Sequence, residues 1–216
     1  RESILLAGRG AIHVEKGNQE DTRITRSNGA KFKISCPNFF LPSSKKWEKR
    51  NVKVVLIDGI VENISEINHL LEEAASSDNT YMIVARGYEP DVIQTLYVNI
   101  LRGTIDVMPI LTDMDQNTVN IFTDLGVICG CDVISSLKGE LISKVQLDNL
   151  AEIDRATVTG GQLEIQNKKT SQPIYFHIKN LKKKIFLVVL LLIVNWRLTL
   201  HQDEEDLVVA LLKWKM

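Results

Sequence analysis

The sequence predicts an α/β fold, a layered β/α domain with parallel βαβ units and flanking helices, plus a β-hairpin. From Val52 onward, short apolar runs alternate with segments whose apolar residues recur at helical spacing. Such alternation is typical of parallel strands joined by helical crossovers. Further along, Gly160 and Gly161 separate two short apolar runs, which predicts a hairpin with a two-residue turn. With 216 residues, the chain is long enough to bury an ample core.

Two strands and an aromatic segment are predicted before this alternation begins. Ala11–Glu15 and Lys31–Ser35 both alternate apolar and polar residues, the pattern of a strand with one buried face. Pro37 ends the second strand, because proline cannot donate a hydrogen bond to a sheet. Phe39–Leu41 then lies between two prolines, where aromatic residues either fold back onto the core or form an exposed contact surface.

The remaining elements follow from apolar spacing and helix-end signals. Asn63, with Glu66 three residues later, forms a capping box that starts a helix at Ile64. The strands predicted in this part of the chain are Val52–Ile57, Tyr81–Ala85, Thr104–Leu111, Val127–Ile134, Ala156–Thr159 and Leu163–Ile165. The helices predicted between them are Ile64–Ala74, Pro90–Leu101 and Asn117–Leu125.

The helix Pro90–Leu101 carries more apolar residues than a single buried stripe requires. Proline at its first turn and Gly103 after its last turn mark its two ends. One stripe contains Val92, Leu96 and Ile100, and three further apolar side chains widen it or lie off it. These three are Ile93, Tyr97 and Val98. The surplus predicts a second apolar surface, either buried against another element or offered to a partner.

Composition narrows the class of protein. A net charge of −1 argues against nucleic acid as a partner, since a phosphate-binding surface shows as a basic excess. The three cysteines are an odd number, which does not suit a disulfide framework and predicts a reducing, cytoplasmic compartment. The chain begins at Arg1 without a basic and apolar leader, so we expect no signal peptide and a piece of a longer protein.

The apolar run Ile185–Val194 follows Lys182–Lys184 and invites a membrane interpretation. Its ten residues fall short of the roughly 20 that a membrane-spanning helix needs. We therefore predict a buried strand here and no membrane partner.

A search for catalytic or metal-binding patterns finds little. None of the four histidines has a partner at zinc spacing, and no phosphate-binding glycine motif is present. Cys129-Gly130-Cys131 is interpreted as small residues packed in a strand. Asp58 ends a predicted strand, where α/β enzymes place catalytic carboxylates, but no acid or base accompanies it nearby in the sequence. We expect no bound metal and no cofactor in this chain.

Six segments occur in an order that resembles a known family: Gly10–Gly17, Cys36–Phe39, Val54–Asp58, Tyr97–Gly103, Val127–Ser135 and Leu147–Leu150. They are similar to G-x-I-x-V-E-x-G, S-P-Y-F, I-L-L-x-D, V-V-N-x-x-R-G, L-T-G-G-x-V-I-S and L-E-D-L of the group I chaperonins, the GroEL family. The resemblance covers roughly Gly10 to Ile178 and lies in the apical domain. Identity within the motifs is thin, which favours a divergent member such as a viral one, and then the host cytoplasm.

The resemblance implies a chaperone fragment that binds non-native polypeptides, and a co-chaperonin loop, in a groove between two helices. Such a fragment assists ATP-driven folding in a homo-oligomeric ring. The matching polypeptide-binding positions are Ile34, Phe39, Leu71, Ile93, Tyr97 and Val98. ATP and magnesium belong to an equatorial domain absent here, so no catalysis is expected from this chain by itself. Asp206 is a candidate remnant of an aspartate that supports ATP hydrolysis in the family.

Two positions depart from the family pattern. Asn68 stands where the family has an apolar contact residue, and Asn38 replaces the aromatic residue of S-P-Y-F. Both make the predicted groove more polar and bear on co-chaperonin dependence. Asn99 and Arg102 match the family, for which structural or interface roles are expected.

The resemblance divides the chain into three parts. Residues 1–17 form a leading strand from an intermediate-type segment, residues 18–180 the apical-like polypeptide-binding domain, and residues 181–216 a return segment that does not follow the family.

Two other functions remain open. One is an α/β enzyme or ligand-binding domain with its site near Asp58, and the other is a structural or membrane-peripheral protein anchored through Lys182–Val194. Exposure of the three surplus side chains of the helix Pro90–Leu101 distinguishes them, because only the polypeptide-binding function requires it.

Overall fold

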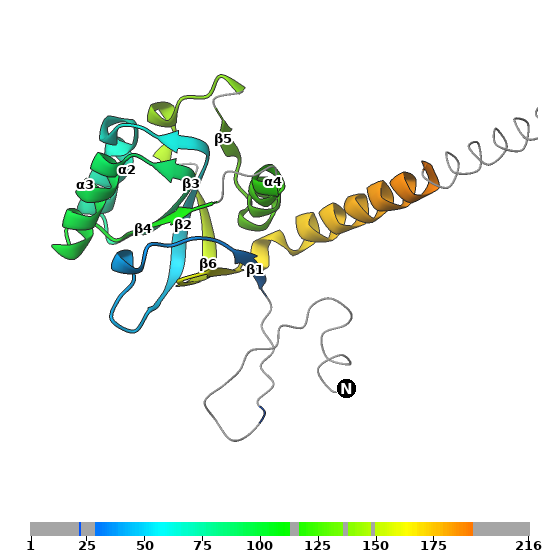
Figure 1. Ribbon diagram of the computed structural model, residues 1–216, viewed down its shortest axis with the longest axis horizontal. Helices are drawn as coiled ribbons and strands as arrows, with labels where there is room; N and C mark the ends of the chain where they lie inside the picture. The colour runs from blue at the N-terminus through cyan, green and yellow to red at the C-terminus, as the bar shows by residue number, and fades with distance from the viewer. Residues whose placement is uncertain (1–21, 23–28, 113–116, 136–137, 148–149, 192–216) are drawn as a thin grey trace, which may run out of the picture. The chain divides into compact units, whose positions relative to one another are not determined.

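The computed structural model describes residues 22, 29–112, 117–135, 138–147 and 150–191 (Figure 1). The chain divides into two compact units, residues 1–168 and 169–216. The predicted strand Ala11–Glu15 lies outside the described residues.

The first unit is built on a seven-stranded mixed sheet with the order β1-β7-β6-β2-β3-β4, and β5 also pairs with β2. The strands are β1 (Ala30–Lys33), β2 (Lys46–Val61), β3 (Thr80–Tyr88), β4 (Val107–Leu111), β5 (Val133–Ser135), β6 (Ala151–Thr159) and β7 (Gln162–Gln166). Strands β3 and β5 run parallel to β2, and β4 runs parallel to β3. The other pairs, β1 with β7, β7 with β6 and β6 with β2, are antiparallel. The sheet therefore combines a parallel βαβ part with an antiparallel hairpin part, as the sequence predicts.

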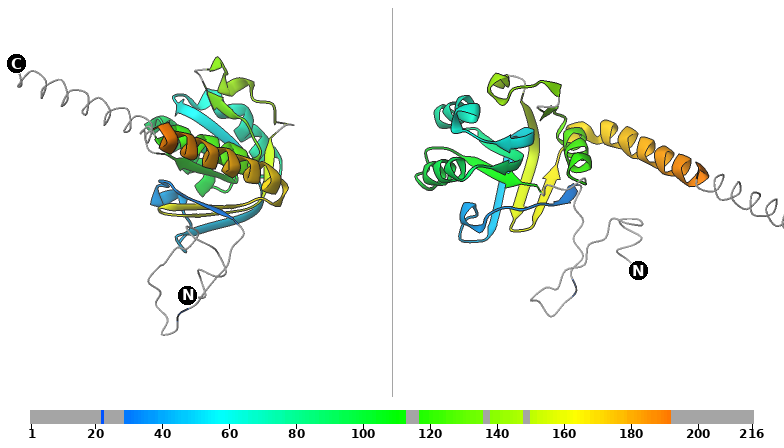
Figure 2. Two further views of the ribbon diagram at one scale, coloured as in Figure 1. Left: turned by 90° about the vertical axis from the view of Figure 1, so that its right-hand side faces the viewer. Right: turned by 45° about the horizontal axis from the view of Figure 1, so that its top comes forward.

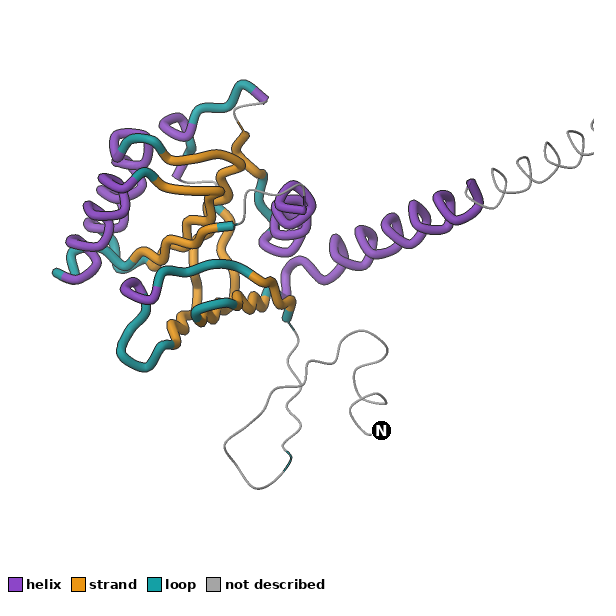
Figure 3. Tube along the Cα trace, viewed as in Figure 1, coloured by secondary structure: helices purple, strands orange, loops and turns teal. Residues whose placement is uncertain are grey.

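Three helices complete the layers. Helices α2 (Ile64–Ser76) and α3 (Pro90–Leu101) lie side by side on one face of the sheet, and α4 (Asn117–Cys129) lies on the opposite face (Figures 1 and 2). Figure 3 shows the strands as the central layer between them. Helix α2 buries Ile67, Leu70, Leu71 and Ala74, and α3 buries Val92 and Leu96.

Helix α2 begins as its sequence predicts. Asn63 Oδ1 accepts a hydrogen bond of 3.0 Å from the backbone N–H of Ser65. The Glu66 carboxylate accepts a 3.2 Å bond from the N–H of Glu62, one residue before the cap, instead of from the cap itself. Side chains thus satisfy two backbone donors near the helix start.

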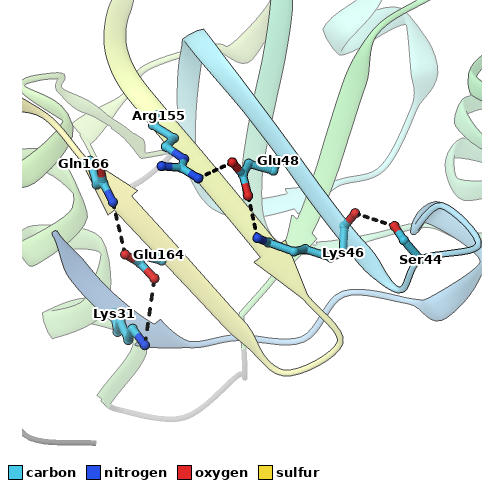
Figure 4. A network of polar contacts seen from close by, with 7 residues as sticks. All are labelled: Lys31, Ser44, Lys46, Glu48, Arg155, Glu164 and Gln166. Carbon is cyan, nitrogen blue, oxygen red and sulfur yellow. Dashed lines mark hydrogen bonds and ion pairs between the residues drawn. The ribbon is translucent and has the colours of Figure 1, made fainter. Parts of the chain in front are cut away.

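The hairpin of β6 and β7 matches its prediction closely. Thr159 pairs with Gln162, which leaves Gly160 and Gly161 as a two-residue turn. An exposed network of charged side chains joins this hairpin to its neighbours (Figure 4). Glu48 contacts both Lys46, at 2.5 Å, and Arg155, and hydrogen bonds from these two lower the pKa of its carboxyl group. Lys31 and Glu164 are 3.8 Å apart. Because these pairs are solvated, they contribute little to stability.

The predicted strand Val127–Ile134 is wrong in its first half. Helix α4 continues to Cys129, and β5 contains only Val133–Ser135. Gly130, with φ at +76°, ends the helix in the left-handed conformation that glycine adopts freely. A short apolar run does not distinguish a strand from a buried helical turn, so Cys129 lies at a helix end and not in a strand.

The predicted buried strand Ile185–Val194 is also wrong for its described part. Residues 171–191 form one helix, and its apolar side chains from Ile185 to Leu191 are exposed. A strand needs a neighbouring strand to satisfy its backbone, whereas a helix satisfies its backbone internally. Among the described residues, no helix is both long and apolar enough to cross a membrane.

We predict that Asn63→Ala lowers the free energy of unfolding by about 1 kcal/mol, because the Ser65 N–H loses its side-chain acceptor. Asn63→Asp keeps an acceptor oxygen and should unfold like the wild type. Urea denaturation followed by circular dichroism measures both. Equal midpoints for the alanine and aspartate variants would contradict the role assigned to this cap.

Candidate functional site

The candidate site lies where α3 meets the 3₁₀ turn η1 (Asn38–Phe40). Phe39 is 52% exposed, so it occupies the surface. Ile93, Tyr97 and Val98 of α3 are half-buried, and the first two pack against the core. The structure thus brings four of the six sequence-predicted residues to one region with at least partial exposure.

The other two predicted residues belong to the core. Ile34 and Leu71 are 7% and 8% exposed, respectively. Ile34 follows β1, and Leu71 lies on the buried side of α2. They are therefore not part of the exposed surface.

Aromatic rings join η1 to α3. The Phe39 and Tyr97 rings meet edge to face with centroids 5.5 Å apart, and the Phe39 and Phe40 centroids are 4.6 Å apart. Phe40 is buried and also meets Tyr97 edge to face, at 6.4 Å. Aromatic pairs of this kind contribute about 0.5–1.5 kcal/mol beyond the area they bury. Phe40 therefore anchors the turn, while Phe39 presents its ring to solvent.

The backbone before the turn is fixed to the sheet. Ser35 and Leu111 exchange two backbone hydrogen bonds of 3.0 and 2.9 Å, which attach the segment to the end of β4. Within the turn, the Phe40 N–H donates to the Pro37 carbonyl at 3.0 Å. The exposed aromatic ring is consequently held on a rigid base.

Sequence reasoning missed Leu101 as a surface residue. It lies at the end of α3 and is 71% exposed. Together with Phe39, Tyr97 and Ile100, it lines a cavity of about 630 Å³ that extends toward Lys46–Lys49. The available signal was its angular position on α3, since at 100° per residue Leu101 falls outside the stripe that contains Val92 and Leu96.

Helix α2 contributes a polar surface to this side of the domain. Asn68 is exposed, and its Nδ2 donates a 2.6 Å hydrogen bond to the Glu72 carboxylate one turn later. Asn38 in η1 is exposed as well. The two departures noted in the sequence therefore both lie on the surface, and the apolar area is concentrated on α3 and Phe39.

The alternative site at Asp58 is occupied by a structural ion pair. Arg86 Nε donates a 2.5 Å hydrogen bond to Asp58 Oδ1, and the two side chains are only 22% and 13% exposed, respectively. The pair links β2 to β3 just beyond the register position Ile57–Ala85, where the ladder becomes irregular. An aspartate held in this way neutralises a neighbouring arginine, and this arrangement does not favour a catalytic role.

Among the described residues, the titratable and metal-ligating side chains do not form a second candidate for a catalytic or metal-binding site. Among the described residues, no three His, Cys, Asp or Glu side chains gather as a metal site would require. Burial raises the pKa of Cys36 to about 11, which keeps this thiol protonated at neutral pH, and burial lowers the pKa of His69, which favours its neutral form.

We predict that Asp58→Asn costs about 3 kcal/mol of unfolding free energy, because it leaves the Arg86 charge largely buried without its counter-ion. The double variant Asp58→Leu/Arg86→Met removes both charges and should recover most of the loss. Urea denaturation of the three proteins measures this. A single variant as stable as the wild type would show that the ion pair is dispensable and would reopen a functional role for Asp58.

By sequence, the chain is similar to curated chaperonins. No protein-family model matches the chain. The chain is 22% identical over 186 residues to Chaperonin GroEL 1 of Prochlorococcus marinus (strain MIT 9215), a match that covers 84% of this chain and 32% of that protein. It is 24% identical over 185 residues to Chaperonin GroEL of Mycoplasmoides gallisepticum, covering 83% of this chain and 35% of that protein. The chain thus spans about a third of the length of these relatives.

The fold has a counterpart among solved structures. The crystal structure of the chaperonin gp146 from the bacteriophage EL 2 (Pseudomonas aeruginosa), in the presence of ATP-BeFx, superposes with a TM-score of 0.60 at 15% sequence identity. That match covers 74% of this chain and 33% of the phage protein. The relatives found by sequence and the shared fold together show a divergent GroEL-like chaperonin domain, similar in architecture to an apical domain.

Proposed function

We propose that this chain is the polypeptide-binding part of a chaperonin and captures non-native proteins on the apolar surface formed by η1 and α3. The observation that carries the proposal is the exposed Phe39 ring in contact with Tyr97. Half-buried Ile93 and Val98 and the exposed Leu101 lie on the same helix as Tyr97. The relatives are chaperonins by name, which supports a chaperone function in general.

The chemistry of this surface suits many clients. Non-native chains expose apolar side chains, and their burial stabilises a complex by about 25 cal/mol per Å². About 200 Å² of buried apolar area therefore provides about 5 kcal/mol before the entropy of binding is subtracted. Because this interaction is not directional, the surface does not select one sequence.

The polar side of α2 limits the extent of the surface. In a groove between two helices, both helices would contribute apolar side chains, but Asn68 is hydrogen bonded to Glu72 and Leu71 is buried. We therefore assign client binding mainly to α3 and Phe39, with Ile34 and Leu71 as supporting residues. A co-chaperonin loop, if it binds the same surface, meets fewer apolar partners on α2.

The proposed activity depends on a larger assembly. The relatives are about three times as long as this chain, so we place ATP and magnesium binding, and ring formation, in parts of the protein outside it. The chain by itself is then a binding module without catalysis, in a cytoplasmic protein. Asp206 lies outside the described residues, and its role in ATP hydrolysis stays a prediction.

We predict that Phe39→Ser weakens capture of a chemically denatured client about tenfold. Loss of a half-exposed aromatic ring removes about 1.4 kcal/mol of burial on binding. The measurement is suppression of client aggregation, by light scattering, as a function of chain concentration. A second variant, Tyr97→Glu/Val98→Ser, should abolish suppression, provided that circular dichroism shows an intact fold.

Leu141→Ser is the matched control for Phe39→Ser. Leu141 is a similarly exposed apolar residue, at 58%, in the segment before the 3₁₀ turn η3 (Ile142–Lys144), and it lines a different cavity from the one that Phe39, Tyr97 and Leu101 line. It should leave suppression unchanged. Equal losses from Phe39→Ser and Leu141→Ser would point to non-specific adhesion, and no loss from any variant would overturn the assignment to η1 and α3.

A further inference from the structure

The turn after α4 places two thiols beside each other. All three cysteines of the chain are free, and Cys129 and Cys131 are separated by one residue. Neither thiol has a part in the proposed capture of polypeptides. Cys129 is the last residue of α4, and Cys131 follows the glycine that ends the helix.

The backbone of this turn is folded back on the helix. The Gly126 carbonyl accepts hydrogen bonds from the N–H groups of Gly130, at 2.8 Å, and Cys131, at 3.1 Å. Gly130 has φ at +76°, a conformation that suits glycine and returns the chain toward the last helical turn. In an extended chain, the Cα atoms of residues two positions apart are separated by roughly 7 Å. In a chain that folds back they are closer, so the Cα atoms of Cys129 and Cys131 fall in the range of roughly 4.4–6.8 Å that a disulfide requires.

Close packing holds the turn in place. A Cβ atom on Gly126 would lie 3.0 Å from the Cys131 carbonyl oxygen, so the backbone of Cys131 sits directly against the helix. The turn places the Cys131 thiol close enough to Cys129 to raise, together with burial, the pKa of Cys129. The two sulfur atoms are therefore neighbours before any reaction.

The two thiols differ in access. Cys129 is 2% exposed, whereas Cys131 is partly exposed. Cys131 also borders a cavity of about 460 Å³, whose wall includes Leu56, Ile134 and Leu141. A small molecule can therefore reach Cys131 but not Cys129.

We propose that Cys129 and Cys131 form a reversible disulfide by exchange with a low-molecular-weight disulfide such as oxidised glutathione. The Cys131 thiolate attacks one sulfur of the reagent, which gives a mixed disulfide and releases one glutathione thiolate. The Cys129 thiolate then attacks the Cys131 sulfur and releases the second glutathione thiolate, which takes up the proton that Cys129 has lost. Two protein thiols are oxidised to one disulfide, and one glutathione disulfide is reduced to two thiols.

The order of attack follows from the surroundings of each sulfur. The neighbouring Cys131 thiol and burial both raise the pKa of Cys129, and Cys129 is also the less exposed of the two, so it is the weaker first nucleophile. Once Cys131 carries glutathione, Cys129 is the neighbouring free thiol and resolves the mixed disulfide. Cys36 serves as an internal control for a thiol that should not react, because it is 4% exposed and burial raises its pKa to about 11.

Oxidation would add a covalent ring to the junction between α4 and β5. β5 pairs with β2 over Leu56–Asp58, so the ring stiffens the connection between a helix and the centre of the sheet. In a reducing compartment such a bond is transient, which is typical of a redox-responsive site and not of a structural one.

The test uses the full chain in glutathione buffers of increasing oxidised fraction. Free thiols are trapped with a maleimide after acid quenching and counted by intact mass, with peptide mapping to assign them. We expect the wild type to lose two maleimide-reactive thiols, Cys129 and Cys131, and to regain both on addition of dithiothreitol. Cys36 should stay free under native conditions.

Two variants separate the steps. Cys129→Ser should accumulate one glutathione on Cys131, since no thiol remains to resolve it. Cys131→Ser should leave Cys129 unmodified, because Cys129 is buried. Circular dichroism checks that both variants are folded. The proposal is overturned if the wild type keeps glutathione on Cys131, if both thiols stay free in the most oxidising buffer, or if Cys129 reacts equally fast without Cys131.

Discussion

Burial of β2 on both faces is the constraint on which the rest of the fold depends. Val52 and the run Val54–Ile57 are all 2% exposed or less, and the strand pairs with β3, β5 and β6. A strand enclosed in this way needs helices over both faces of the sheet, which α2 and α3 on one side and α4 on the other supply (Figure 1). The first charged residue after the apolar run, Asp58, must then be neutralised, and Arg86 on β3 does so.

The candidate site uses this rigid frame to keep apolar side chains in water. Val92 and Leu96 hold α3 against the core, and Phe40 anchors η1. Phe39 and Leu101 are therefore kept at the surface. Exposed apolar area of this kind costs solubility, and a protein retains it where the area meets a partner. Hydrogen bonds between Ser35 and Leu111 make the aromatic turn part of the sheet instead of a loose loop.

Local signals in the sequence were sufficient for some elements and not for others. The capping residue Asn63, the terminal Gly103 and the Gly160-Gly161 turn each act within a few residues, and each was predicted correctly. The run Val127–Cys129 was assigned to a strand because its apolar residues fit either a strand or a buried helical turn. The structure assigns these residues to the last turn of α4, and the strand begins only at Val133. The run from Ile185 failed similarly, since a strand exists only where a neighbouring strand accepts it.

The sequence by itself determined the order of the elements as far as Ile165, the apolar surplus of α3 and the resemblance to chaperonins, because periodicity, caps and turns are encoded by neighbouring residues. The tertiary structure decided which of the surplus side chains meet solvent. It buried Ile34 and Leu71, exposed Phe39 and Leu101, and paired Asp58 with Arg86. The physical reason is that burial depends on what packs against a residue from distant parts of the chain, and one helix or strand does not contain that information.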